Sequence, residues 1–138
     1  MGRFGQGRGW FVIQALLAVI LLAMILAFSS MPDLPSMTVA PFDSLRSSTL
    51  VQKGGHFAGY GLLGVFIFGL LPRHLSLRWR VAITLMLILT VGALDEMHQV
   101  SVPGRHARIT DVMIDTSGAA AALGIRIFGA NRLERIRT

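Results

Sequence analysis

The 138-residue chain contains no cysteine, and only 14% of its residues are charged. The absence of cysteine excludes disulfides, thiolate metal sites and cysteine nucleophiles. A soluble domain carries roughly 25% charged residues, whereas this chain is 53% hydrophobic and has a mean hydropathy of +0.63. The chain has too few polar side chains to cover itself in water. We therefore expect it to lie in a lipid bilayer.

The charges that are present are mostly basic, and they give the chain a net charge of +6. A basic excess can indicate nucleic-acid binding. Here, however, the basic residues stand in short clusters between apolar runs, as is typical of membrane topology. We therefore expect the lipid bilayer, and no nucleic acid, as the partner.

Four apolar runs predict an all-α integral membrane four-helix bundle that forms a single domain over residues 1–138. About 20 residues of helix cross the hydrocarbon core of a bilayer, and the helices are expected at about 10–28, 53–71, 79–100 and 111–128. The first run could instead be a cleaved signal peptide, but such peptides have apolar regions of only about 7–15 residues. Between the last two runs, Pro103-Gly104 fits the central positions of a type II turn.

The distribution of Lys and Arg predicts the orientation of the bundle. These residues are concentrated in the N-terminal tail, in the loop between the second and third helices, and after the fourth helix. We therefore expect a multi-pass protein with both termini in the cytoplasm. The loops at 29–52 and 101–110 are expected to face outward.

Polar residues recur in the outer turns of three of these helices, at spacings that place them on one helix face. The set consists of Lys53, His56 and Tyr60 on the second helix, Asp95, Glu96 and Gln99 on the third, Asp111 and Asp115 on the fourth, and Arg105 in the preceding turn. A charge that faces lipid costs several kcal/mol. We therefore expect these faces to turn toward one another around a polar pocket that opens outward. Small-residue pairs such as Gly55 with Gly59 and Gly118 with Ala122 would let the helices approach closely.

The residue types in this pocket suggest both acid–base and anion-binding chemistry. A carboxylate among Asp95, Glu96 and Asp111 could act as general acid or base, with His56 as its proton partner. Lys53 and Arg105 could hold a phosphate at two helix N-termini. Tyr60, Gln99 and Asp115 complete the predicted substrate-binding set. The expected ligand is an anionic lipid headgroup or a lipid-linked envelope precursor. No cofactor is predicted, and without HxxxH or HExxH spacing no metal site is predicted either.

Several other interpretations remain open. Asp111 could only complement the helix dipole, Arg105 and Arg108 could be interfacial anchors, and His56 and Tyr60 could form hydrogen bonds inside the bundle. At the level of function, the acids could serve as a relay in an ion- or proton-coupled transporter. The chain could also be an accessory subunit whose polar cluster only sets helix register. The oligomeric state, the substrate and the existence of a reaction stay undetermined.

Two stretches of the chain resemble a known family. KGGHFAGYGLLG resembles the KxxHFxxYxxLG stretch of the VanZ-like membrane proteins. LDEMHQVSVPGRHARITDVMIDTSGAAAALG resembles their DExxQ, PGR and DxxxNxxGxxxG stretches, in the same order and at similar spacing. The matched motif residues are Lys53, His56, Tyr60, Asp95, Glu96, Gln99, Arg105, Asp111 and Gly118.

The chain departs from the family pattern in two places. Gln52 stands where an acid usually precedes the lysine, and Asp115 stands where an asparagine is usual. The resemblance implies a small four-helix protein of the bacterial plasma membrane with a role in the cell envelope. The family's namesake is tied to lowered sensitivity to the glycopeptide antibiotic teicoplanin. The resemblance implies no settled reaction.

Overall fold

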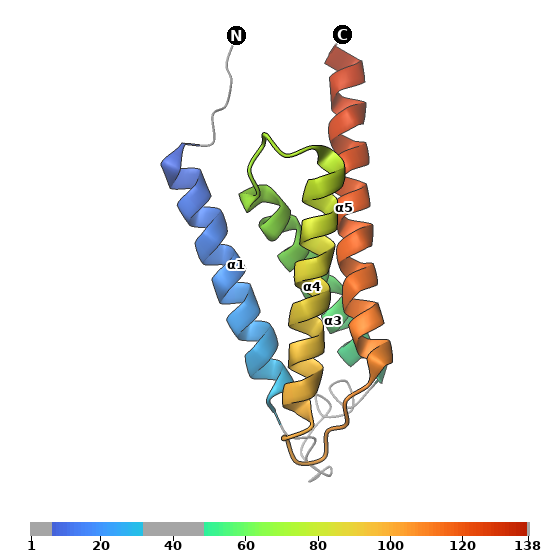
Figure 1. Cartoon of the computed structure of the whole chain (residues 1–138). Helices are drawn as coiled ribbons and strands as arrows, with labels where there is room; N and C mark the ends of the chain where they lie inside the picture. Colours follow the sequence, from blue (N-terminus) through green and yellow to red (C-terminus); the bar gives the residue numbers. More distant parts are fainter. Residues whose placement is uncertain (1–6, 32–48, 138) are drawn as a thin grey trace, which may run out of the picture.

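The computed structural model describes residues 7–31 and 49–137, which form four helices and no strand (Figure 1). The helices are α1 (Arg8–Ser29), α3 (Thr49–Leu70), α4 (Leu77–Gln99) and α5 (Ile109–Arg137). The predicted all-α four-helix architecture is therefore confirmed. Most of the predicted outer loop at 29–52 lies outside the described residues.

Three of the four helices are long and apolar enough to cross a membrane: α1, α4, and α5 as far as Arg132. A helix of 22 residues, such as α1, is ~33 Å long, which matches the ~30 Å hydrocarbon core of a bilayer. Large apolar side chains cover the outside of these helices, and Trp10, Val19, Met86 and Ile125 are all exposed. Surfaces of this kind are suited to lipid rather than to water.

Helix α3 is as long as α1, but it contains six glycines together with Lys53 and His56, so it is less apolar. It packs closely against α5 and also contacts α1 and α4, whereas α1 and α5 do not touch in the described part of the chain. Much of α3 therefore faces protein instead of lipid. This position explains how it accommodates polar and small residues.

Glycines bring α3 and α5 into close contact. A Cβ atom at Gly118 would overlap the backbone carbonyl of Phe57, and one at Gly64 would lie only 3.0 Å from the Cβ of Ala119. Gly61 likewise lies against the backbone of Gly118. The prediction of close packing at Gly118 is therefore confirmed.

Of the predicted small-residue pair on α3, Gly59 lies at a close helix contact and Gly55 does not. A Cβ at Gly55 would meet nothing within 4 Å, and one at Gly59 would contact Ile25 of α1 instead of α5. The glycines that face α5 are Gly61 and Gly64. They lie on a different side of the helix because successive residues are rotated by about 100°.

The helix bounds differ from the predicted ones at two places. Helix α3 begins at Thr49, so Lys53 lies one turn inside the helix and not at its start. Helix α5 continues to Arg137, well beyond the predicted end near residue 128. Its last two turns are polar, so they extend past the apolar segment. The type II turn is confirmed, because Gly104 has φ of 80° and the Arg105 N–H donates to the Val102 carbonyl at 3.1 Å.

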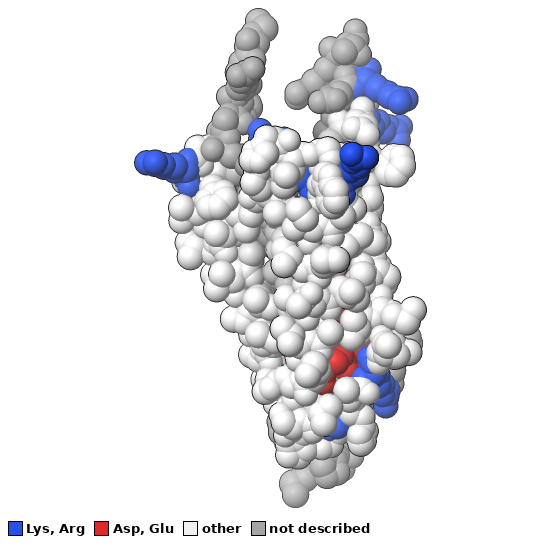
Figure 2. All heavy atoms as spheres, viewed as in Figure 1, with Lys and Arg blue, Asp and Glu red and all other residues white. Residues whose placement is uncertain are grey.

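The polar residues of the bundle are divided between its two ends. Helix α1 begins and α5 ends at the same end (Figure 1). Figure 2 shows most of the visible Lys and Arg at that end, while the visible acidic atoms lie toward the other end beside a smaller basic group. The side of the membrane that each end faces stays a prediction.

Candidate functional site

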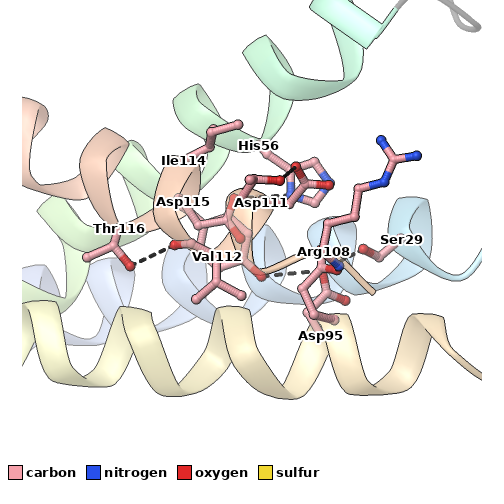
Figure 3. A network of polar contacts seen from close by, with 12 residues as sticks. Ser29, His56, Asp95, Arg108, Asp111, Val112, Ile114, Asp115 and Thr116 are labelled. Carbon is pink, nitrogen blue, oxygen red and sulfur yellow. Dashed lines mark hydrogen bonds and ion pairs between the residues drawn. The ribbon is translucent and has the colours of Figure 1, made fainter. Parts of the chain in front are cut away.

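Most of the buried polar side chains of the described residues gather where α1 ends, α3 begins, α4 ends and α5 begins (Figure 3). They are Ser29, Asp95, Glu96, Gln99 and Asp115, with the hydroxyl of Tyr60 among them. Each of the four helices contributes at least one member. The site is therefore a property of the whole bundle and not of one segment.

Asp95 is the centre of one half of the cluster. Its side chain is 1% exposed, and its Oδ2 atom accepts hydrogen bonds from Ser29 Oγ at 2.5 Å, Gln99 Nε2 at 3.2 Å and Tyr60 Oη at 3.4 Å. Gln99 Nε2 also donates to Ser29 Oγ at 2.7 Å. One carboxylate oxygen thus connects α1, α3 and α4. The other, Oδ1, is buried and has no hydrogen-bond partner among the described residues.

His56 and Asp115 form the second half of the cluster. His56 Nδ1 lies 3.1 Å from Asp115 Oδ1, and the two side chains are 23% and 1% exposed. The His56 ring stacks on the Tyr60 ring at a centroid distance of 6.0 Å. A buried carboxylate therefore orients an imidazole that reaches the surface. This is the arrangement in which a histidine can serve as an oriented general base.

Gly92 of α4 makes room for Asp115. A Cβ atom at this position would lie 3.1 Å from Asp115 Oδ2, a distance that would crowd the carboxylate. That same Oδ2 atom is buried without a hydrogen-bond partner in the described part of the structure. Asp115 is thus packed against the backbone of α4, and only one of its two carboxylate oxygens is hydrogen-bonded to the described residues.

Glu96 connects the cluster to the turn before α5. Its Oε2 atom accepts the backbone N–H of Arg108 at 2.7 Å. Arg108 immediately precedes α5, where backbone N–H groups lack helical partners and the helix dipole favours a negative charge. Glu96 is 4% exposed, and its Oε1 atom also has no partner among the described residues. Glu96 therefore supports the start of α5 through only one of its two oxygens.

Arg105 extends across the end of α1. Its Nε donates to the Met31 carbonyl at 3.3 Å, and its Nη2 donates to the Phe28 carbonyl at 3.4 Å. A cation at this position complements the negative end of the α1 dipole. The phosphate-binding role of Arg105 stays a prediction. Its two hydrogen bonds to carbonyl groups at the end of α1 also give it a structural role.

The remaining predicted residues lie at the edge of the cluster. Lys53 is half-buried one turn before His56, and no hydrogen bond joins it to the other described side chains. Asp111 is half-buried in the first turn of α5, where its Oδ1 accepts the Thr110 hydroxyl at 3.3 Å. Both are closer to solvent than the three buried carboxylates. They are therefore better placed to meet an incoming ligand first.

Sequence reasoning missed Ser29. It is the last residue of α1 and is 1% exposed. In the sequence, Ser29 directly follows a long apolar run and looks like an ordinary loop serine. The only signal for a role in the site is its position at the expected membrane boundary. Its neighbour Ser30 also contacts α4, with Oγ 3.1 Å from His98 Nε2. The end of α1 is thus part of the site.

The comparisons with known proteins agree with the motifs. The family model of VanZ/LLP1 matches residues 11–129, which include every residue of the cluster. No curated protein and no solved structure matches the chain.

Proposed function

The chain belongs to the VanZ/LLP1 family, and from this premise we propose that it is a multi-pass cell-envelope protein of the bacterial plasma membrane. Its polar cluster would bind the headgroup of an anionic phospholipid or of a lipid-linked envelope precursor. A role in lowered sensitivity to glycopeptides such as teicoplanin is part of the same proposal.

The observation that carries the proposal is a set of three buried carboxyl groups, each with only one of its two oxygens in a hydrogen bond to the described residues. Asp95, Glu96 and Asp115 are each at most 4% exposed, and each has one oxygen without a partner among the described residues. An unsatisfied buried polar group costs about 1–3 kcal/mol, and ionisable residues within membrane segments are expensive and usually functional. A cluster that served only to hold the helices together would use these oxygens in hydrogen bonds.

The chemistry of the cluster suggests how a headgroup is held. Hydroxyl or amine donors of the headgroup can satisfy the free carboxylate oxygens, while Lys53 and the guanidinium of Arg105 attract its phosphate. His56, held by Asp115, can accept a proton from a hydroxyl or a water molecule at the surface of the cluster. These roles use the helix ends and need no cofactor.

The transporter alternative is weaker because the polar cluster does not continue through the bundle. The next turns inward place Leu63, Ile88 and Ala119 in the core, each at most 2% exposed. Ions and protons need polar groups or water along their path. An apolar layer directly beneath the acids favours a binding site over a pathway.

Native mass spectrometry of the detergent-solubilised protein tests the proposal. We expect the wild type to retain more anionic lipid per protein molecule than Lys53→Gln, because this substitution removes a cation beside the cluster and leaves the arginines at the other end of the bundle in place. Arg78→Gln, which removes the same charge at the other end of the bundle, should retain as much anionic lipid as the wild type. Equal lipid retention by wild type, Lys53→Gln and Arg105→Ala would contradict the proposal and favour an accessory subunit with a structural polar cluster.

A further inference from the structure

A second polar cluster lies at the opposite end of the bundle, where Arg80 of α4 and Arg126 of α5 meet Phe68 of α3. The guanidinium carbons lie 4.1 Å and 5.3 Å from the centroid of the Phe68 ring. Arg80 Nη2 also donates to the Phe68 carbonyl at 2.7 Å, and Arg126 Nη1 donates to the Val65 carbonyl at 2.9 Å. Two cations are therefore held against the C-terminal turns of one helix.

Among the described residues, no acidic side chain forms an ion pair with Arg80 or Arg126. The C-terminus of a helix supplies only about half of a negative charge. The one ion pair among the described side chains joins His56 to Asp115 at the other end. Along α4, Asp95 is roughly 22 Å from Arg80 at 1.5 Å per residue. Because both guanidinium groups lie over one ring, they are within about 10 Å of each other, the Debye length at roughly 0.1 M salt.

The two arginines also have unused hydrogen-bond donors. A guanidinium group has five N–H donors, and the contacts with α3 occupy one on each arginine. Arg80 Nε is buried and has no partner among the described residues. A pair of arginines with free, forked donors is suited to the oxygens of a phosphate, which can accept two parallel hydrogen bonds.

We propose that Arg80 and Arg126 bind the phosphate of an anionic phospholipid headgroup at this end of the bundle. Apolar side chains beside the pair favour a lipid over free phosphate. Leu77 and Trp79 are exposed in the same turn of α4 as Arg80, and Ile125 is exposed in the same turn of α5 as Arg126. Tryptophan is enriched where a bilayer meets water. The arginines would thus hold the headgroup while these side chains contact the acyl chains. The site is separate from the carboxylate cluster and does not depend on its function.

Tryptophan quenching provides a local test, because the chain has only two tryptophans. In a Trp10→Phe background, Trp79 is the single reporter beside Arg80. We expect brominated phosphatidylglycerol to quench Trp79 with an apparent affinity at least about fivefold higher than brominated phosphatidylcholine. Arg80→Gln and Arg126→Gln should each remove most of this preference. Arg132→Gln, which removes an exposed arginine on the same helix, should leave it unchanged.

Three results would overturn the proposal. The first is equal quenching of Trp79 by the two lipids in the parent protein. The second is an unchanged lipid preference in folded Arg80→Gln and Arg126→Gln, which would show that the arginines only cap α3. The third is loss of the preference on adding inorganic phosphate but not chloride at the same ionic strength, which would identify free phosphate as the ligand. If Arg126→Gln does not fold, Arg80→Gln and the conservative Arg126→Lys still decide between these outcomes.

Discussion

His56 Nδ1 lies 3.1 Å from Asp115 Oδ1, and this contact joins α3 to α5 at the polar end of the bundle. The carboxylate is completely buried, whereas the imidazole is partly exposed. The motif resemblance places Asp115 where asparagine is expected, so in this chain a carboxyl group and not an amide contacts the histidine. The pair can therefore be tested with a substitution that introduces the residue expected from the resemblance.

Asp115→Asn should preserve the fold, because the amide oxygen can accept the same hydrogen bond from His56. We expect the free energy of unfolding to change by less than about 1 kcal/mol. If the protein lowers teicoplanin sensitivity, as proposed, and His56 acts as a general base oriented by the carboxylate, this effect on a sensitive host should weaken in both Asp115→Asn and His56→Gln. Full resistance in a stably expressed His56→Gln protein would exclude a proton-transfer role for His56.

Glu96→Gln and Glu96→Ala should behave differently. Glutamine keeps an oxygen that can accept the Arg108 N–H, so we expect a stable protein that binds anionic lipid as well as or better than the wild type, because a negative charge is removed. Alanine leaves the Arg108 amide without its acceptor and should lower the free energy of unfolding by about 1–3 kcal/mol. Thermal unfolding and native mass spectrometry measure the two effects. An acid–base role for Glu96 is wrong if Glu96→Gln folds, binds lipid and retains full cellular activity.

Ser29→Ala should destabilise the bundle, although Ser29 lies at the end of a lipid-exposed helix. The substitution removes the 2.5 Å hydrogen bond to Asp95 and the acceptor of Gln99, which should cost about 1–3 kcal/mol. Ser117→Ala is the matched control, since its hydroxyl is exposed and, among the described residues, donates only to the Ile114 carbonyl of its own helix. Tryptophan fluorescence during thermal unfolding in detergent should show a lower Tm for Ser29→Ala alone. Equal Tm values for the two variants would contradict the network.

Gly118→Ala and Gly124→Ala should have opposite effects on stability. A methyl group at Gly118 would overlap the backbone of Phe57, whereas at Gly124 it meets nothing within 4 Å. Overpacking at Gly118 should cost about 1–3 kcal/mol, while alanine at Gly124 should stabilise the helix by up to about 1 kcal/mol. Denaturant unfolding in detergent measures both. A neutral Gly118→Ala would mean that α3 and α5 can separate without cost.

Single cysteines can test the orientation, because the chain has none of its own. We expect an impermeant thiol reagent to label His106→Cys on intact cells, and to label Arg135→Cys only after the membrane is opened. The reason is the concentration of Lys and Arg at the end where α5 terminates. Labelling of Arg135→Cys on intact cells would reverse the predicted topology.

The sequence alone was sufficient to predict where the four helices lie and that one end of the bundle contains a polar cluster. Apolar runs, glycines and prolines act locally, so they predict where helices lie and where the Pro103-Gly104 turn forms. Asp95, Glu96 and Asp115 were also recognisable as site candidates, because a charge within an apolar run is costly wherever the helix packs. The long polar end of α5 was not predicted, since hydropathy indicates where a membrane segment ends but not where a helix ends.

Only the tertiary structure decided which side chains meet. The contact of Ser29 with Asp95 and that of Arg105 with the Phe28 carbonyl each join residues more than 60 positions apart in the chain. Gly61 and Gly64 face α5, whereas Gly55 does not, because of how α3 is rotated about its own axis. Rotation and axial register are set by the packing of all four helices at once. No single helix sequence contains that information, because each helix offers small or polar residues on more than one face.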